Sequence, residues 1–251
     1  MEYTYGLLGL KLSHSFSQKY FEEKFKNLNL SHHSYLNFEI ENINDLKEIL
    51  ENNNSLQGLN VTIPYKESVI NYLDELSEEA KEIGAVNAIK IIRDHNKIYL
   101  KGYNTDAFGF AQSIKPFLDI NHQRALILGN GGAAKAVKYV LTKLGIDYVV
   151  VSRNPDKTKN EIGYNKLNSF AIEHYKFIVN TTPLGMYPDI NTYPLIPYEG
   201  ITSLHLCVDL IYNPEKTLFL QKAEQQESKI LNGLTMLKMQ AEKAWEIWNQ
   251  S

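Results

Sequence analysis

A lysine stands shortly after a strand-like segment in the stretch LNVTIPYKES, residues 59–68. Asn60 and Thr62 would share one face of an extended chain, and Pro64 cannot donate to a continuing strand ladder. Lys66 is therefore predicted to lie just beyond a strand end, where α/β proteins place ligand-binding groups. A lysine amine has a pKa of about 10.4 in water, so an ammonium there could donate a proton in catalysis. The alternative is an ordinary solvated charge.

Asp106 is a second candidate, in the stretch KGYNTDAFGF at 101–110, which follows a strand-like run and opens a helical one. The stretch places Asn104, Thr105 and Asp106 together before that helical run. The competing interpretation is that Asp106 caps the amino end of a helix beginning at Ala107. The local sequence alone favours the cap.

Two hydroxyls stand close together in the stretch GLKLSHSFS at 9–17, which also follows a strand-like run. Ser15 and Ser17 could converge on one ligand, although a serine N-cap of the following helix is the alternative. His14 has no histidine or carboxylate partner at metal-ligand spacing, so it is interpreted as structural. No metal site is expected anywhere in the sequence.

The stretch GNGGAA, residues 129–134, joins a strand-like run to a helical one. Gly129 permits a tight turn, Gly131 lets a pyrophosphate approach the backbone, and Gly132 or Ala133 allows close helix packing. The spacing is G-x-G-G-x-A and departs from the full dinucleotide-binding pattern. A glycine turn without a ligand therefore remains the alternative.

The end of the next strand indicates which dinucleotide would bind. A site for NAD usually places an acid there, whereas a site for NADP places an arginine that meets the 2′-phosphate. The sequence has Ser152, Arg153 and Asn154 at this point, with Lys157 nearby and no acid at the strand tip. NADP(H) is favoured; the alternative is that Arg153 is a solvated loop residue.

Strand-like and helix-like segments alternate along the chain, which is typical of α/β folds with parallel sheets. The expected strands are 4–10, 33–40, the stretch from 59, 85–92, 97–104, 125–128, 147–154, 175–186 and 204–214. The expected helices are 15–29, 42–52, a polar segment up to about 83, one within 129–145, and 233–250. We expect an N-terminal α/β domain at 1–104 and a Rossmann-like dinucleotide-binding domain at 105–232, with 233–251 packing back onto the first.

The composition excludes several classes of protein. The 251 residues carry a formal net charge of −3 with mixed signs, which gives no sign of a nucleic-acid or membrane-surface partner. Cys207 is the only cysteine, so no internal disulfide can form, and a reducing compartment is expected. No signal peptide and no apolar run of about 18 residues is visible, so we expect a soluble, cytoplasmic protein.

Eight segments, taken together, resemble the successive signatures of the shikimate dehydrogenase family. They span essentially the whole chain in this order: GLKLSHSFS, NVTIPYK, GAVNAI, GYNTD, GNGGAA, NTTPLGM, DLIYNP and GLTMLKMQA. One departure is Lys11, which stands where the family usually has a proline that stiffens the loop. The 2′-phosphate region also has fewer basic residues than many relatives have, which leaves room for a looser cofactor preference.

The resemblance implies reversible, NADPH-linked reduction of 3-dehydroshikimate to shikimate on the route to chorismate and the aromatic amino acids. It implies that Lys66 is the proton-transfer group, acting with Asp106. The implied substrate-binding residues are Ser15, Ser17, Thr62, Asn87, Asp106, Tyr212 and Gln240. The implied NADP-binding residues are Gly129, Asn130, Gly131, Gly132, Ala133, Ser152, Arg153, Asn154, Lys157, Leu210 and Gly233.

Other functions remain open. A quinate/shikimate dehydrogenase with looser cofactor choice would need a pocket that accepts one more ring hydroxyl. A non-catalytic sensor of the same ligand would have no need for both Lys66 and Asp106. A methylene-tetrahydrofolate dehydrogenase-type protein fits the paired serines and the GYNTD segment poorly. The protein is expected to be a monomer or a homodimer.

Overall fold

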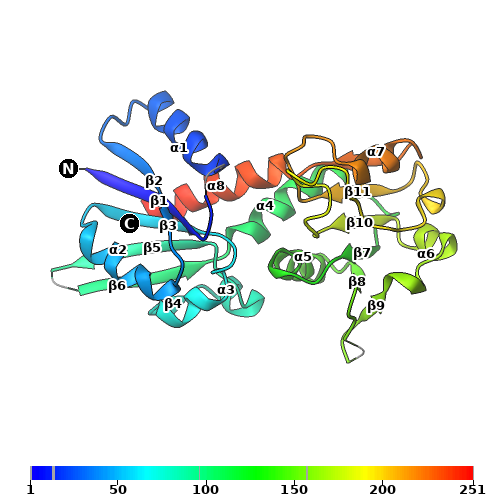
Figure 1. The fold of residues 1–251 in the computed structure, drawn as a ribbon, viewed down its shortest axis with the longest axis horizontal. Coiled ribbons are helices and arrows are strands. Elements are labelled where there is room, and N and C mark those ends of the chain that lie inside the picture. The colour runs from blue at the N-terminus through cyan, green and yellow to red at the C-terminus, as the bar shows by residue number, and fades with distance from the viewer. Residues whose placement is uncertain (1, 13–14, 96, 157, 251) are drawn as a thin grey trace. The chain divides into compact units, whose positions relative to one another are not determined.

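The computed structural model describes residues 2–12, 15–95, 97–156 and 158–250. They form two compact units: unit 1 is Met1–Thr105 with Ala241–Ser251, and unit 2 is Asp106–Gln240. The chain enters unit 2 at the start of α4 (Thr105–Ile114) and returns to unit 1 within α8 (Leu234–Asn249). The last helix is thus divided between the units. Each unit is a β-sheet with helices on it (Figure 1).

The sheet of unit 1 has the strand order β2-β1-β3-β5-β6-β4. Its strands are β1 (Tyr3–Gly9), β2 (His33–Glu39), β3 (Leu56–Val61), β4 (Glu75–Leu76), β5 (Ala88–Asp94) and β6 (Lys97–Tyr103). β1 runs parallel to β2 and β3, whereas β5 is antiparallel to both β3 and β6. β1, β3 and β6 therefore end at the same edge, where β5 begins. We call this edge the carboxyl edge of unit 1.

Helices cover both faces of this sheet because both faces are apolar. α1 (Phe16–Asn27) and α8 pack on one face through a cluster that includes Phe21, Phe25 and Trp248. α2 (Leu46–Asn52) and α3 (Glu78–Ile83) pack with the cluster on the other face. Fully burying a phenylalanine side chain stabilises a fold by about 1.5–3 kcal/mol, so these clusters hold the carboxyl edge in place.

The sheet of unit 2 is parallel throughout its described pairs, with the order β12-β11-β10-β7-β8-β9. Its strands are β7 (Arg124–Leu128), β8 (Asp147–Ser152), β9 (Glu161–Gly163), β10 (Phe177–Asn180), β11 (Leu206–Asp209) and β12 (Lys229–Leu231). After β9 the chain returns to β10 on the other side of β7. Such a reversal is the switch point at which open α/β sheets bind ligands. The carboxyl edge of unit 2 is the edge where these strands end.

Both faces of this sheet are also covered, as its non-alternating apolar runs predict. Leu126 and Leu128 pack with the cluster of α6 (Ser169–His174) and α7 (Leu218–Glu224). Ala125 and Ile127 point to the other face and are equally buried. Another helix of unit 2, α5 (Gly132–Lys143), follows β7 directly. The predicted α/β class is confirmed.

The polar segment expected to be helical up to residue 83 folds differently. A short 3-10 helix, η2 (Ser68–Tyr72), is followed by β4, and only then by α3. Asp74 causes the break, because its backbone N–H and its carboxylate both bond to the backbone of Leu100 in β6. The predicted helix at 42–52 is likewise a 3-10 turn, η1 (Ile43–Asp45), and then α2.

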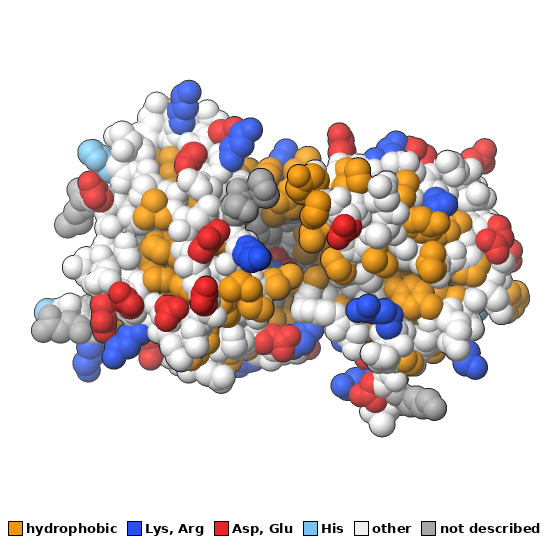
Figure 2. Space-filling model, viewed as in Figure 1, with side chains coloured by type: hydrophobic (Ala, Val, Ile, Leu, Met, Phe, Trp, Pro, Cys, Tyr) orange, Lys and Arg blue, Asp and Glu red, His pale blue; other side chains and the backbone are white. Residues whose placement is uncertain are grey.

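Acidic and basic side chains are interspersed on the face drawn in Figure 2, so neither sign of charge dominates this face. Such a mixture does not favour the polyanion binding that a basic face would support. Among the described residues, no helix is both long enough and apolar enough to cross a membrane.

Two buried histidines lie at the amino ends of strands in unit 2. His205 precedes β11 and accepts the N–H of Thr202 at Nδ1 (2.9 Å) while Nε2 bonds to the carbonyl oxygen of Ile172 (3.0 Å). This pattern fits the neutral ring, because a proton on Nδ1 would point at the N–H of Thr202. Burial lowers the pKa of both His205 and His122.

The stability of the protein should therefore fall as the pH drops below about 6.5, the ordinary histidine pKa. The pKa of each histidine is lower in the folded protein than in the unfolded chain, so the unfolded chain binds more protons as the pH falls. The contribution of the neutral histidines to the free energy of unfolding is therefore complete only above about pH 6.5. Between about pH 7.5 and about pH 5.5, the thermal midpoint of the wild type should fall further than that of His205→Gln. Asp209, whose pKa burial raises to about 6, acts in the opposite direction but is present in both proteins. Equal losses in the two proteins would contradict the prediction.

Candidate active site

Thr62 lies at the carboxyl edge of unit 1, directly after β3. Its N–H donates to the carbonyl oxygen of Leu8 (2.9 Å), which fixes it over the end of β1. A Cβ atom on Gly9 would approach Thr62 Cγ2 to 2.6 Å, so only glycine lets the threonine pack there. The local chain thus places this predicted substrate residue between two strand ends.

Lys66 follows in a turn that is anchored on both sides. The N–H of Val86 donates to the Lys66 carbonyl oxygen (2.7 Å), and the N–H of Tyr65 donates to the carbonyl oxygen of Thr62 (3.0 Å). The buried Tyr65 hydroxyl donates to the carbonyl oxygen of Ile40 (2.7 Å). The Lys66 side chain is half-buried, so it is not the fully solvated charge of the alternative interpretation.

Asn87 and Thr105 meet at the same edge and are both buried. The Asn87 amide donates to Thr105 Oγ1 (3.0 Å) and accepts the Thr105 N–H (2.6 Å). Asp106 follows Thr105 in the chain and lies inside the first turn of α4, which begins at Thr105. The expectation that Asp106 caps a helix starting at Ala107 was therefore wrong. A carboxylate in a first turn is still favoured by the helix dipole.

Ser15 and Ser17 lie at the start of α1, next to the end of β1. Ser15 is the N-cap, because its hydroxyl accepts the N–H of Gln18 (3.5 Å), so the capping interpretation of this serine is confirmed. Ser17 is buried and its side chain neighbours the hydroxyl of Tyr35. His14 lies outside the described residues.

Gln240 lies on α8 where that helix packs against α4 within unit 2. A Cβ atom on Gly109 would approach the Met236 carbonyl oxygen to 2.5 Å and the Gln240 backbone nitrogen to 3.0 Å, so the glycine permits a close helix crossing. Asp106 stands three residues before Gly109 and so shares its helical face. Gln240 is buried and its amide donates to the Leu237 carbonyl oxygen (3.0 Å).

Tyr212 follows β11 in a loop that a buried carboxylate holds. Asp209 accepts hydrogen bonds from Thr217 Oγ1 (2.6 Å), the Ile211 N–H (3.0 Å) and the Asn180 amide (3.1 Å). Burial raises the pKa of Asp209 to about 6 against these bonds. Burial also raises the pKa of Tyr212, so its phenol stays a hydrogen-bond donor.

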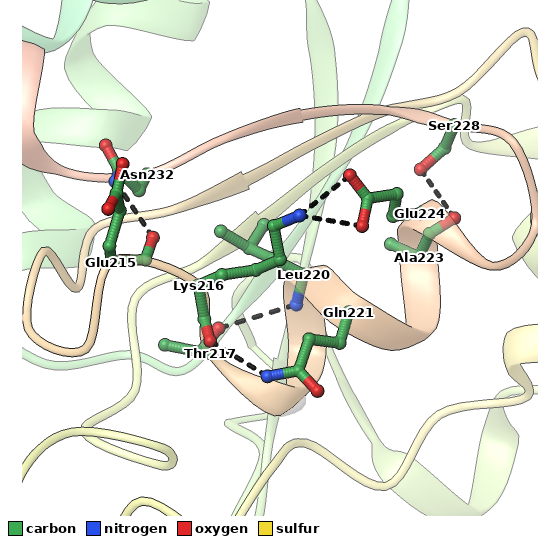
Figure 3. Close-up of polar contacts among 9 residues, drawn as sticks. All are labelled: Glu215, Lys216, Thr217, Leu220, Gln221, Ala223, Glu224, Ser228 and Asn232. Atoms are coloured by element: carbon green, nitrogen blue, oxygen red, sulfur yellow. Dashed lines mark hydrogen bonds and ion pairs between the residues drawn. The ribbon is translucent and has the colours of Figure 1, made fainter.

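The same loop is tied to the turn that begins α8. Figure 3 shows Asn232 beside Glu215, where its amide donates to the Glu215 carbonyl oxygen (2.9 Å), and Lys216 paired with Glu224. Next to Asn232, a Cβ atom on Gly233 would stand 2.0 Å from the Leu210 carbonyl oxygen. Gly233 is therefore required for the two loops to meet, and the structure brings these two predicted cofactor residues together.

The glycine turn after β7 is open. Gly129 has a φ of 101°, which favours glycine, whereas a Cβ atom on Gly131 or on Gly132 would meet nothing within 4 Å. Asn130, Gly131 and Gly132 are exposed, and Ala133 is half-buried. Unobstructed N–H groups at the start of α5 suit the pyrophosphate of a dinucleotide.

The strand end beside this turn also fits a dinucleotide. Ser152 Oγ is buried and has no hydrogen-bond partner among the described residues, so it is available to a ligand hydroxyl or phosphate. Arg153 and Asn154 follow it and are exposed. Lys157 lies outside the described residues. Within the described part of the chain, no group of three or more His, Cys, Asp or Glu side chains could hold a metal ion.

Comparison with known proteins decides the family. Residues 7–89 match the family model described as the shikimate dehydrogenase substrate binding domain. The shikimate dehydrogenase (NADP(+)) of Carboxydothermus hydrogenoformans is 39% identical over 97% of this chain and 90% of its own length. That of Clostridium beijerinckii is 41% identical over 98% of this chain and 92% of its own. The chain belongs to the shikimate dehydrogenase family.

Similarity to solved structures supports the same family assignment. The chorismate mutase/shikimate 5-dehydrogenase fusion protein from Clostridium acetobutylicum is 38% identical, with a TM-score of 0.86 over 99% of this chain and 92% of that chain. Shikimate 5-dehydrogenase from Thermus thermophilus, in complex with NADP(H) and shikimate, is 29% identical, with a TM-score of 0.84 over 98% of this chain and 93% of that chain. Quinate dehydrogenase from Corynebacterium glutamicum, in complex with NAD, is 25% identical with a TM-score of 0.86, covering 99% and 94%.

The shikimate dehydrogenase motifs identified the residues at the strand ends but not the buried residues that hold them. Asn60 lies in the NVTIPYK motif close to Thr62, and Thr105 lies in the GYNTD motif beside Asp106. Their position in the sequence could therefore have indicated that they support these site residues. Tyr35 and Glu161 had no such signal, because the side chains to which they bond, Asn60 and Asn130, are 25 and 31 residues away in the chain.

Proposed function

We propose that this protein catalyses the reversible, NADPH-linked reduction of 3-dehydroshikimate to shikimate. The observation that carries the proposal is 41% identity, over almost the whole of both chains, to a protein named shikimate dehydrogenase (NADP(+)). The positions of the predicted residues are consistent with it. They lie at the carboxyl edges of the two sheets and on the facing helices α4 and α8, where α/β folds place ligands.

Lys66 is the proton-transfer group in this proposal. NADPH, when bound, supplies a hydride to the carbonyl carbon of the substrate. Negative charge then develops on the carbonyl oxygen, and the Lys66 ammonium donates a proton to that oxygen. Asp106 orients the ammonium by charge attraction. In the direction of shikimate oxidation, the Lys66 amine takes the hydroxyl proton.

The substrate is a small acid with several hydroxyls, and neutral polar groups bind such a molecule well. The neutral groups proposed to bind it are those of Ser15, Ser17, Thr62, Asn87, Tyr212 and Gln240. Each hydrogen bond fixes the ring, because an analogue that lacks one partner would leave a buried polar group unpaired.

Arg153 gives the preference for NADP over NAD. Its guanidinium meets the 2′-phosphate, and Ser152 and Asn154 bind neighbouring atoms of the same ribose phosphate. Gly129 to Ala133 approach the pyrophosphate at the start of α5. Leu210 and Gly233, whose loops meet, would also hold the cofactor.

The second candidate is oxidation of quinate. The similarity of this fold to that of a quinate dehydrogenase, at a TM-score of 0.86, favours it as the alternative. Quinate carries one more ring hydroxyl than shikimate, so the two activities differ by what the pocket accepts at one ring position.

A spectrophotometric assay tests the oxidation of shikimate and the oxidation of quinate. Purified protein mixed with shikimate and NADP⁺ should give rising absorbance at the reduced nicotinamide band, and faster than with NAD⁺ or with quinate. No absorbance change with shikimate and either cofactor would refute the proposed function. We further propose a reducing, cytoplasmic location, because Cys207 is buried and unpaired with another cysteine.

A further inference from the structure

A continuous chain of hydrogen bonds runs behind the carboxyl edge of unit 1. It links side chains of β2, β3 and the edge itself, and all its members are at most 9% exposed. Its members, in order, are Tyr35, Asn60, Asn87 and Thr105. The chain therefore connects Tyr35, which neighbours the predicted substrate residue Ser17, with Asn87 and with the residue that precedes Asp106.

Tyr35 is the first member of this chain. Its hydroxyl donates to Asn60 Oδ1 (2.8 Å). Burial raises the pKa of Tyr35, and the neighbouring Ser17 side chain acts against that shift. Its ring stacks on Phe21 with a centroid distance of 4.6 Å and an angle of 8°. A ring that is 2% exposed and stacked in this way cannot change its position without disturbing α1, so the hydroxyl is a fixed point.

Asn60 extends the link from Tyr35 to the strand ends. Its amide donates to the Asn87 carbonyl oxygen (3.3 Å), beside the bond between the Val61 N–H and the same oxygen (2.9 Å). The Asn87 side chain then binds both the N–H and the hydroxyl of Thr105. A displacement at Tyr35 would therefore pass to Ser17 on one side and to Asn87 on the other.

We propose that Tyr35 is a positioning residue for the substrate, acting through Ser17 and Asn60 without touching the ligand. This inference deepens the proposed function and depends on it. A tyrosine with a purely structural role can bond to backbone, as Tyr65 does with the carbonyl oxygen of Ile40. The Tyr35 hydroxyl instead donates to the side chain of Asn60 at the carboxyl edge and neighbours Ser17, which distinguishes the two tyrosines.

The test is Tyr35→Phe, which removes only the hydroxyl and keeps the ring stacking. The KM for shikimate should rise about 10-fold, because Asn60 loses a partner and Ser17 a neighbouring hydroxyl. The kcat should change less, and the KM for NADP⁺ should stay at the wild-type value. The matched control is Thr4→Val, which also removes a buried hydroxyl bonded to Ser55 (2.9 Å), but at the amino end of β1.

A double-mutant cycle with Ser17→Ala adds a readout that loss of stability would not move. If Tyr35 acts through Ser17, Tyr35→Phe should cost much less in the Ser17→Ala background than in the wild type. Fully additive effects, a shikimate KM within twofold of the wild type, or an equal rise in Thr4→Val would each overturn the inference. Circular dichroism of each variant checks that the fold is kept.

Failure of the inference is distinguishable from failure of the proposed function. An active wild type with no effect of Tyr35→Phe overturns only the role of Tyr35. If the wild type does not oxidise shikimate, the proposed function fails, and the dissociation constant of shikimate measured by calorimetry then tests Tyr35. A wild type that neither oxidises nor binds shikimate overturns both.

Discussion

Replacing Lys66 by methionine is expected to lower the kcat for shikimate oxidation by about 10²–10⁴-fold, the usual contribution of general acid–base catalysis. Methionine keeps much of the length of the stem and removes the ammonium. The turn around residue 66 should survive, because backbone bonds from Val86 and to Thr62 hold it without the lysine side chain. The binding of shikimate should therefore change much less than its turnover. Steady-state kinetics and calorimetric titration measure the two quantities separately.

The matched control is Lys47→Met on α2, whose side chain is 83% exposed and pairs only loosely with Glu51 (3.9 Å). It removes the same charge from the same unit and should leave kcat unchanged. A Lys66→Met enzyme that keeps kcat within about threefold of the wild type would remove Lys66 from the mechanism.

Replacing Arg153 by alanine is expected to raise the KM for NADPH by about 10–100-fold, the value of a charge-assisted pair with a phosphate. The KM for NADH should stay near the wild-type value, because NADH has no 2′-phosphate. The Ser152 hydroxyl, which has no hydrogen-bond partner among the described residues, and the open glycine turn remain in the variant, so the rest of the dinucleotide should still bind. Binding of both cofactors can be followed by quenching of protein fluorescence as well as by activity.

Arg124→Ala is the control for Arg153, because Arg124 begins β7 at the opposite edge of the same sheet and contacts His174 there. It removes an arginine from unit 2 and should leave the KM for both cofactors unchanged. If Arg153→Ala raised the two KM values equally, the 2′-phosphate assignment would be wrong and the preference for NADP would need another source.

Short elements with long-range partners are where sequence patterns failed. β9 and β12 are each three residues long, too short for any periodicity to indicate a strand. β4 has two residues and pairs with β6, and this pairing breaks the helix that the polar pattern favoured. The local sequence favours Asp106 as the cap of a helix beginning at Ala107, yet α4 begins at Thr105, whose N–H donates to the distant Asn87.

Glu161 illustrates the same limit inside the dinucleotide unit. Its buried carboxylate accepts hydrogen bonds from the Asn130 amide (2.5 Å) and the Asp156 N–H (3.1 Å). It thereby joins the glycine turn to the loop after β8, although it belongs to a strand with no recognisable pattern. Nothing local marks a glutamate as the link between two loops.

The sequence by itself determined the α/β class, the glycine turn, the lysine beyond a strand end and the family to which these motifs belong. Each of these depends on residues that are neighbours in the chain, and neighbours report local geometry directly. Only the tertiary structure decided that the ends of β1, β3 and β6 share an edge with the start of β5, and that Tyr35 neighbours Ser17 and bonds to Asn60 there. Strand order and buried hydrogen bonds join residues far apart in the chain, so they follow from how the whole core packs and from no short segment.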